Sequence, residues 1–174
     1  MEFPRLPSRD TSGQKVVLPD DLEGDQTLVL ISFDRRQQSL VGSWRGFAKE
    51  LCETYGHFEY YELLVLGSRS GMMPSLPGGG GMSPGAARSR PHDNALVTRV
   101  NKTALQRRLG LLGEGNIYAL FIEDGTVVRQ AAGVLTPETA DALEDLLQQW
   151  REANSGWTDA PGTSGATGDN ALDS

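Results

Sequence analysis

The chain has 174 residues, of which 38% are hydrophobic and 22% charged, a composition typical of one globular domain with a buried core. Its formal net charge of −7 argues against nucleic acid and acidic lipid surfaces as partners, because both are bound by basic surfaces. The single cysteine, Cys52, excludes an intramolecular disulfide and any Cys-x-x-Cys site for redox chemistry or zinc.

The start of the chain, MEFPRLPSRD, lacks a basic region followed by an apolar stretch. We therefore expect no signal peptide and a cytoplasmic location. The longest apolar run, residues 28–33, is far shorter than the ~20 residues of a membrane helix, so we expect no membrane insertion. We expect no cofactor and no metal site, and the partner we expect is a protein. The sequence sets no oligomeric state.

The first part of the chain predicts two strands. Residues 1–15 read as an irregular lead-in, and Lys15–Gln26 reads as a short strand followed by a turn that contains glycine. The continuous apolar run Thr27–Phe33 predicts a strand that is buried on both faces of a sheet.

From Ser39 the apolar period changes from two to about 3.6, which predicts a helix with Gly56 as its stop. Phe58–Gly67 then returns to strand. These two strands and the helix form a β-α-β unit, in which the strands should lie parallel. The expected buried stripe of the helix is Leu40, Trp44, Phe47, Leu51 and Tyr55.

The middle of the chain, residues 67–94, is rich in Gly, Pro and Ser and has no period. Insertions of this length are usually functional or disordered. Its GGGG run, residues 78–81, reads as a flexible linker, because no phosphate-binding motif follows it. Met72, Met73 and Met82 could be soft ligands for Cu(I), but no cysteine or histidine pair accompanies them. We prefer the interpretation that this loop folds over the domain or docks a partner. His57 and His92 have no metal-ligand neighbour at useful spacing.

The last third contains the clearest local signals. Ala95–Val100 predicts a strand, and a short helix follows between an Asn101 cap and a Gly110 stop. Asn116–Glu123 and Thr126–Gly133 predict a hairpin across the Asp124-Gly125 turn.

Thr136 should then cap a final helix with Pro137 at its first position. Leu143, Leu146, Leu147 and Trp150 should form its buried face. We expect a single domain over residues 1–152 and a disordered polar tail over 153–174. Trp157 stands alone in that tail, where it could fold back onto the body or anchor a partner.

This order of elements resembles the thioredoxin-like fold, in particular its peroxiredoxin-like (AhpC/TSA-type) branch. Gly13–Phe33 is similar to the opening of that branch, and Leu109–Gly133 is similar to its closing hairpin. The resemblance spans roughly residues 13–151. It implies an α/β fold, a three-layer α/β/α sandwich with a central mixed sheet.

A closer resemblance is to a cysteine-poor group that includes the mitochondrial ATP-synthase assembly factor. Members of that group resemble this chain in having a Gln followed by a Ser-Trp pair after the central strand. The matching residues are Gln37 or Gln38, then Ser43 and Trp44. This resemblance implies a binding or assembly role rather than catalysis.

A redox site of this fold requires a thiolate at the end of the central strand, where the helix dipole lowers the pKa of cysteine. Residues 34–39 offer only Asp, Arg, Gln and Ser there. The resemblance also implies a cis-proline before the strand that faces the site, and Ile117 occupies that place. We therefore predict that the fold is redox-inactive, and we expect Asp34 to cap the helix.

The candidate binding residues lie at the same end of the sheet: Arg35, Arg36, Gln37, Gln38, Asn116 and Ile117. The arginines could bind a carboxylate or phosphate at the helix N-terminus, or simply pair with nearby acids on a solvated turn.

Two functions stay open on this evidence. The first is a redox-inactive binding or assembly module, with a groove formed by residues 34–39, the strand entry at 116–117 and the glycine-rich loop. The second is a peroxiredoxin-like antioxidant or redox sensor that uses Cys52, which requires an exposed thiol of lowered pKa. A core role for Cys52 is the more usual one for a free cysteine.

Overall fold

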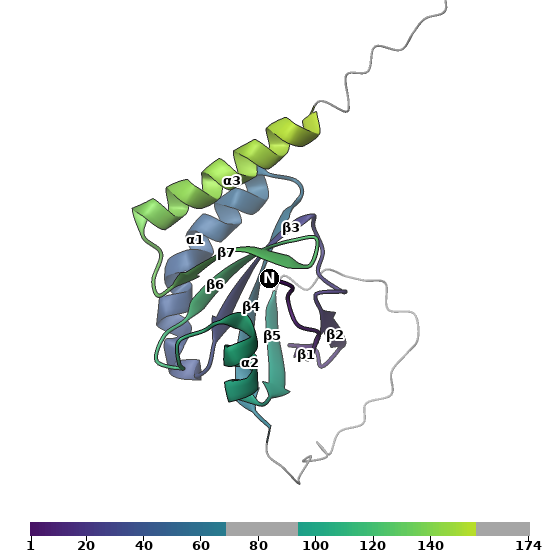
Figure 1. Ribbon diagram of the computed structural model, residues 1–174, viewed down its shortest axis with the longest axis vertical. Helices are drawn as coiled ribbons and strands as arrows, with labels where there is room; N and C mark the ends of the chain where they lie inside the picture. The colour runs from purple at the N-terminus through teal and green to yellow at the C-terminus, as the bar shows by residue number, and fades with distance from the viewer. Residues whose placement is uncertain (69–93, 156–174) are drawn as a thin grey trace, which may run out of the picture.

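The computed structural model describes residues 1–68 and 94–155. Its centre is a mixed seven-stranded sheet with the strand order β2-β1-β5-β4-β3-β6-β7 (Figure 1). The elements in chain order are β1 (Leu6–Asp10), β2 (Lys15–Leu18), β3 (Gln26–Ser32), the 3-10 turn η1 (Arg35–Gln37), α1 (Gln38–Thr54), β4 (Phe58–Gly67), β5 (Ala95–Val100), α2 (Lys102–Leu109), β6 (Tyr118–Glu123), β7 (Thr126–Ala132) and α3 (Pro137–Ser155).

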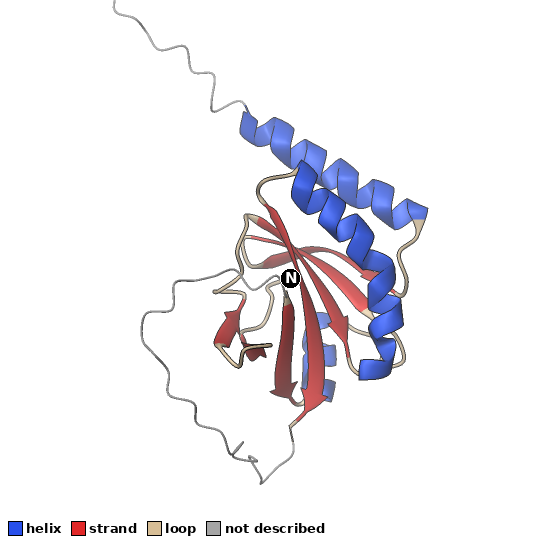
Figure 2. Cartoon of the chain, turned by 180° about the vertical axis from the view of Figure 1, so that it is seen from behind, coloured by secondary structure: helices blue, strands red, loops and turns tan. Residues whose placement is uncertain are grey.

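Helices lie on both sides of this sheet. α1 and α3 lie side by side on one side, and their buried residues form one core cluster with alternate residues of β3 and β6 (Figure 2). α2 lies on the other side, where Leu105 and Leu109 join a second cluster. This α/β/α arrangement with a mixed sheet confirms the predicted fold class.

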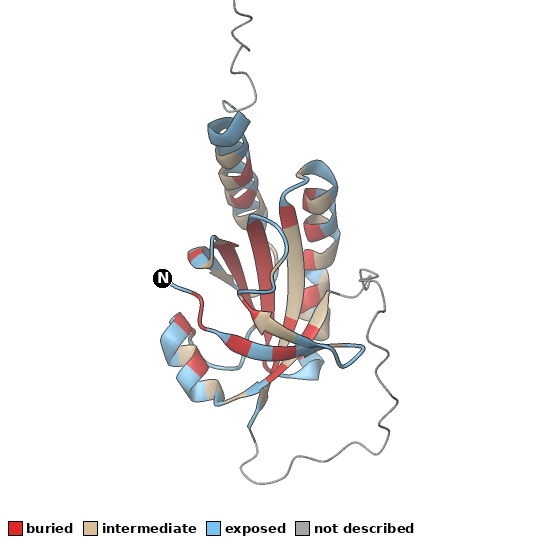
Figure 3. Ribbon diagram, turned by 90° about the vertical axis from the view of Figure 1, so that its right-hand side faces the viewer, coloured by how far each residue is buried: buried red, intermediate tan, exposed pale blue. Residues whose placement is uncertain are grey.

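β3 is an interior strand of the sheet, between β4 and β6, and all seven of its residues are buried (Figure 3). Leu28 and Leu30 point into the α1–α3 cluster, whereas Val29 and Ile31 point into the α2 cluster. β3 pairs parallel with β4 and antiparallel with β6. The predicted strand buried on both faces and the predicted parallel β-α-β unit are therefore confirmed.

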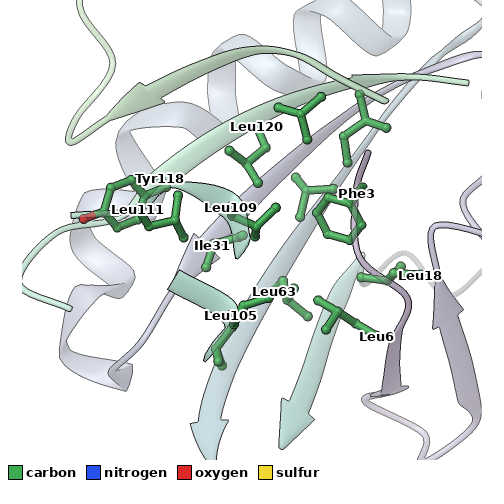
Figure 4. Close-up of a cluster of buried hydrophobic side chains, with 14 of the residues drawn as sticks. Phe3, Leu6, Leu18, Ile31, Leu63, Leu105, Leu109, Leu111, Tyr118 and Leu120 are labelled. Carbon is green, nitrogen blue, oxygen red and sulfur yellow. The ribbon is translucent and has the colours of Figure 1, made fainter. Parts of the chain in front are cut away.

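The N-terminal residues are not an irregular lead-in, which corrects that prediction. β1 pairs antiparallel with both β2 and β5. Phe3 and Leu6 are only 2% and 5% exposed, and their side chains lie in the α2-side cluster (Figure 4). Pro7 interrupts the strand pattern, and β5 follows far along the chain, so no local pattern identifies β1 as a strand.

The predicted local signals are confirmed. Asn101 caps α2 by accepting a hydrogen bond from the Ala104 N–H at 3.0 Å, and Gly110 ends the helix in the left-handed conformation. Asp124 and Gly125 both have positive φ, as a tight turn between antiparallel strands requires. The Thr136 hydroxyl accepts from the Thr139 N–H at 3.3 Å at the start of α3.

Several predicted boundaries change. α1 ends at Thr54, and its cap residue Tyr55 is extended, so Gly56 is not a left-handed stop. β6 begins at Tyr118 rather than Asn116. α3 continues to Ser155, so residues 153–155 of the expected tail are helical.

Residues 69–93 and 156–174 lie outside the described part of the chain. The predictions for the glycine-rich segment, the three methionines Met72, Met73 and Met82, His92 and Trp157 fall there. No helix in the two described ranges is long and apolar enough to cross a membrane.

Candidate functional site

The candidate site lies where β3 ends and α1 begins. Phe33 follows the strand, and Asp34 then has an extended backbone with φ −145° and ψ 142°. Its Oδ1 accepts a hydrogen bond from the Arg36 N–H at 2.8 Å. Together with Gln37 this makes a capping box, so the expected capping role of Asp34 is confirmed.

The Gln37 side chain closes this turn. Its Oε1 accepts from the Phe33 N–H at 2.8 Å and from the Asp34 N–H at 3.3 Å. Its Nε2 donates to the Glu114 carbonyl oxygen at 2.7 Å. The residue is 9% exposed, so a nearly buried amide ties the end of β3 to the loop before β6.

Lys102 makes a second tie between the same two segments. Its Nζ donates to the Phe33 carbonyl oxygen at 3.1 Å and pairs with Glu114 Oε2 at 2.9 Å. The ammonium group also lies 6.0 Å from the centre of the Phe33 ring. Backbone groups at the end of β3 are therefore held by both Gln37 and Lys102.

A third set of contacts holds the loop after β7. The Gly133 N–H donates to the Ile117 carbonyl oxygen at 2.9 Å, and Trp44 Nε1 donates to the Gly133 carbonyl oxygen at 3.0 Å. The Ser43 hydroxyl accepts from the Leu135 N–H at 3.1 Å. Gln37, Ser43 and Trp44 thus all brace one end of the sheet.

The structure brings the predicted binding residues to this end of the sheet but divides their roles. Arg35 and Arg36 are exposed, and neither forms an ion pair with another described residue. Gln37 and Ile117 are buried, and their contacts are structural.

Gln38 and Asn116 have local contacts of their own. Gln38 accepts from Arg45 Nη2 at 2.9 Å, and the same guanidinium donates to both carboxylate oxygens of Glu62. Asn116 is exposed, and its Oδ1 accepts from the Ile117 N–H at 3.0 Å.

Sequence reasoning missed Lys102 and Glu114. No local signal marks them, because their contacts join segments far apart in the chain. The burial of Gln37 did have a signal, since Asp-x-x-Gln at residues 34–37 is the pattern of a capping box. A cavity of about 170 Å³, lined by Thr27, Ile122 and the Asp124-Gly125 turn among others, lies at the opposite end of β3.

Cys52 is partly buried against the α1–α3 cluster. Burial, reinforced by the charge of Glu59, raises the pKa of its thiol to about 11. A reactive cysteine requires the opposite shift. His57 Nδ1 lies 3.5 Å from Asp25 Oδ2, and the centre of its ring lies 5.4 Å from the centre of the Trp150 ring.

Within residues 1–68 and 94–155, no group of three or more His, Cys, Asp or Glu side chains is placed to hold a metal ion. The cis peptide bond found in the same ranges precedes Pro19, whereas Ile117 stands at the place implied for a cis-proline. The fold therefore has no thiol and no cis-proline at the end of β3.

No family model and no curated protein matches this sequence. Solved structures do match. A thiol:disulfide interchange protein from Bacteroides sp. is 11% identical, with 89% of this chain and 93% of that chain covered and a TM-score of 0.53. BsSco, a member of the Sco family of cytochrome c oxidase assembly proteins, is 12% identical, with 85% and 92% covered and a TM-score of 0.53.

Yeast Sco1 with copper bound is also 12% identical, with 88% of this chain and 96% of that chain covered and a TM-score of 0.51. The fold is thioredoxin-like. At these identities the matches establish the fold alone. A single cysteine and no Cys-x-x-Cys pair then distinguish this thioredoxin-like chain from a dithiol oxidoreductase.

Proposed function

We propose that this chain is a redox-inactive thioredoxin-like module that binds or assembles with a partner protein. The observation that carries the proposal is the closed turn at the end of β3. There the Gln37 amide makes three hydrogen bonds, so the position that a redox site needs is occupied by a structural side chain. An amide cannot form a thiolate or transfer electrons.

The binding surface that we propose is the exposed end of the sheet around this turn. Arg35 and Arg36 supply two cations without ion pairs among the described residues. Leu112, in the loop before β6, is 93% exposed, and Val134, in the loop after β7, is 47% exposed. Arginine is enriched at protein interfaces, and apolar side chains supply part of the contact area there.

We also propose that this chain is related to the peroxiredoxin-like branch of the fold and to its cysteine-poor assembly-factor group. The resemblance rests on Gln37 or Gln38 and on the Ser43-Trp44 pair. Of these, Gln37, Ser43 and Trp44 brace the closed site, which supports the relationship. The Sco proteins share this fold and are described as cytochrome c oxidase assembly proteins, so the fold does occur in assembly proteins.

The test is affinity capture from the native source with matched variants. Arg35→Ala/Arg36→Ala should lose a specific partner protein. The control Arg107→Ala/Arg108→Ala changes the same charge on exposed residues of α2 and should retain that partner. An unchanged partner set in the first variant would refute this binding surface.

The alternative, redox chemistry at Cys52, is opposed by its partly buried thiol. With a pKa of about 11, only about one thiol in ten thousand is ionised near pH 7. Peroxide or disulfide turnover by the purified chain that disappears in Cys52→Ser would overturn the redox-inactive assignment.

A further inference from the structure

Part of the sheet has no helix over it within the described residues. On the side of the sheet where α1 and α3 lie, these helices cover β3, β6, β7 and part of β4, and no described helix covers β5, β1 and β2 (Figure 2). The strand registers identify the residues on this side. Leu30 of the α1–α3 cluster is in register with Glu62, and Glu62 with Ala95. Alternation along β5 then places Val97 and Arg99 on the same side.

The part of this uncovered face that adjoins β4 is apolar. Val97 is in register with Leu64 of β4, and Arg99 with Leu66. Leu64, Leu66 and Val97 are each partly buried, yet none belongs to either core cluster or packs against one. These side chains therefore form an apolar strip separate from the core.

The uncovered face has the width of one helix. Adjacent strands are spaced by about 4.8 Å, so the axes of β5, β1 and β2 span about 10 Å. An α-helix with its side chains is about 10 Å wide. The faces of α/β sheets are ordinarily covered by helices, and one more helix fits beside α1.

The charged side chains on the rest of the face are all cationic, and we call this part of the face the rim. Arg9 of β1 is in register with Val97 on one side and with Lys15 on the other. Arg9, Lys15 and Arg99 are exposed, and none forms an ion pair within the described ranges. The same alternation places no Asp or Glu on this side of β5, β1 or β2. A cationic rim on a chain of net charge −7 favours an acidic partner.

We propose that this face, formed by β5, β1, β2 and the adjoining strip of β4, docks an amphipathic helix of a partner protein, with acidic residues along the flank that meets Arg9 and Arg99. The connection between β4 and β5 is not complementary to it. Residues 69–93 carry three arginines and one aspartate, which gives them the same sign of charge as the rim. This surface is distinct from the Arg35–Arg36 end and goes beyond the binding role proposed there.

The test is site-specific photo-crosslinking of the full chain in its native source. A benzophenone amino acid replaces Val97, or replaces Val128 on β7 as the control. The linked peptides are then sequenced by mass spectrometry. The Val97 probe should link to an acidic segment of another protein whose apolar residues recur at helical spacing, and the Val128 probe should not.

Charge-reversed variants test the rim. Arg9→Glu/Arg99→Glu should lower the yield of the Val97 crosslink about tenfold. Arg107→Glu/Arg108→Glu, with the same change of charge on α2, should leave the yield within about twofold. Circular dichroism and thermal unfolding of each variant confirm that it is folded.

The outcomes separate this proposal from the first one. A Val97 crosslink to residues 69–93, to residues 156–174, to a second copy or to nothing would overturn the docking face, as would a yield unaffected by Arg9→Glu/Arg99→Glu. Partner capture that depends on Arg35 and Arg36 would still support the proposed function in each case. Conversely, a helix linked at Val97 would stand even if the Arg35–Arg36 surface failed.

Discussion

Replacing Gln37 by Ala should destabilise the domain more than its position on a surface turn implies. The substitution removes hydrogen bonds of 2.8 and 3.3 Å to two backbone N–H groups and one of 2.7 Å to the Glu114 carbonyl oxygen. A typical hydrogen bond contributes about 1 kcal/mol, and a buried group left unpaired costs about 1–3 kcal/mol. Because water can reach part of this turn, we expect a loss of about 3 kcal/mol.

Urea unfolding followed by circular dichroism measures this loss. With a denaturant slope of about 2 kcal/mol per M, the midpoint should fall by about 1.5 M while the slope is unchanged. The matched control is Gln38→Ala in the next residue, which loses one hydrogen bond to Arg45. It should cost under about 1 kcal/mol.

A second control distinguishes the hydrogen bond from Gln37 to the Glu114 carbonyl oxygen from the ion pair between Lys102 and the Glu114 carboxylate. Glu114→Ala retains the carbonyl that Gln37 binds and removes only the carboxylate partner of Lys102. It should cost about 0.2–1 kcal/mol, as expected for a partly exposed pair. If Gln37→Ala costs no more than these controls, the amide does not hold the turn closed.

Three further measurements test other parts of the fold. Phe3→Ala should lower the free energy of unfolding by about 3 kcal/mol, because it removes a side chain that is only 2% exposed from the α2-side cluster. A loss under about 1 kcal/mol in urea unfolding would show that the N-terminal segment is not part of the core. Gln26→Met should raise the free energy of unfolding by about 1 kcal/mol, because Gln26 Nε2 is buried without a hydrogen-bond partner among the described residues. A lower free energy of unfolding in this variant would mean that the Gln26 amide does have a hydrogen-bond partner. In the folded protein the rate of Cys52 alkylation should rise tenfold per pH unit up to about pH 11, because the pKa of the thiol is raised. In the urea-unfolded chain the rate should level off near pH 9. A plateau near neutral pH in the folded protein would contradict the raised pKa.

Local signals in the sequence predicted much of the fold. The Asn101 cap, the Gly110 stop and the Asp124-Gly125 turn depend on residues within a few positions of each other, and the structure confirms all three. The four consecutive apolar residues 28–31 of β3 likewise predicted the strand, because a strand buried on both faces favours apolar side chains at successive positions.

The contacts that close the candidate site could not be predicted in this way. Gln37 reaches Glu114 across 77 residues of sequence, and Lys102 reaches Phe33 across 69. Trp44 and Gly133 are 89 residues apart. Such pairs are set by tertiary packing of the sheet, and the residue types alone do not identify the partner. The strand β1 was missed for the same reason, since its pairing with β5 is equally remote.

Some side chains of the turn hold the backbone and others do not, and this difference indicates where a pair of thiols could be introduced into this fold. A thiol at position 34 would remove the helix cap, and one at position 37 would break all three amide contacts. Positions 35 and 38 have the spacing of a dithiol pair, and the side-chain hydrogen bond given up there is the one between Gln38 and Arg45. Arg35→Cys/Gln38→Cys is therefore a replacement that retains the helix cap and all three Gln37 contacts.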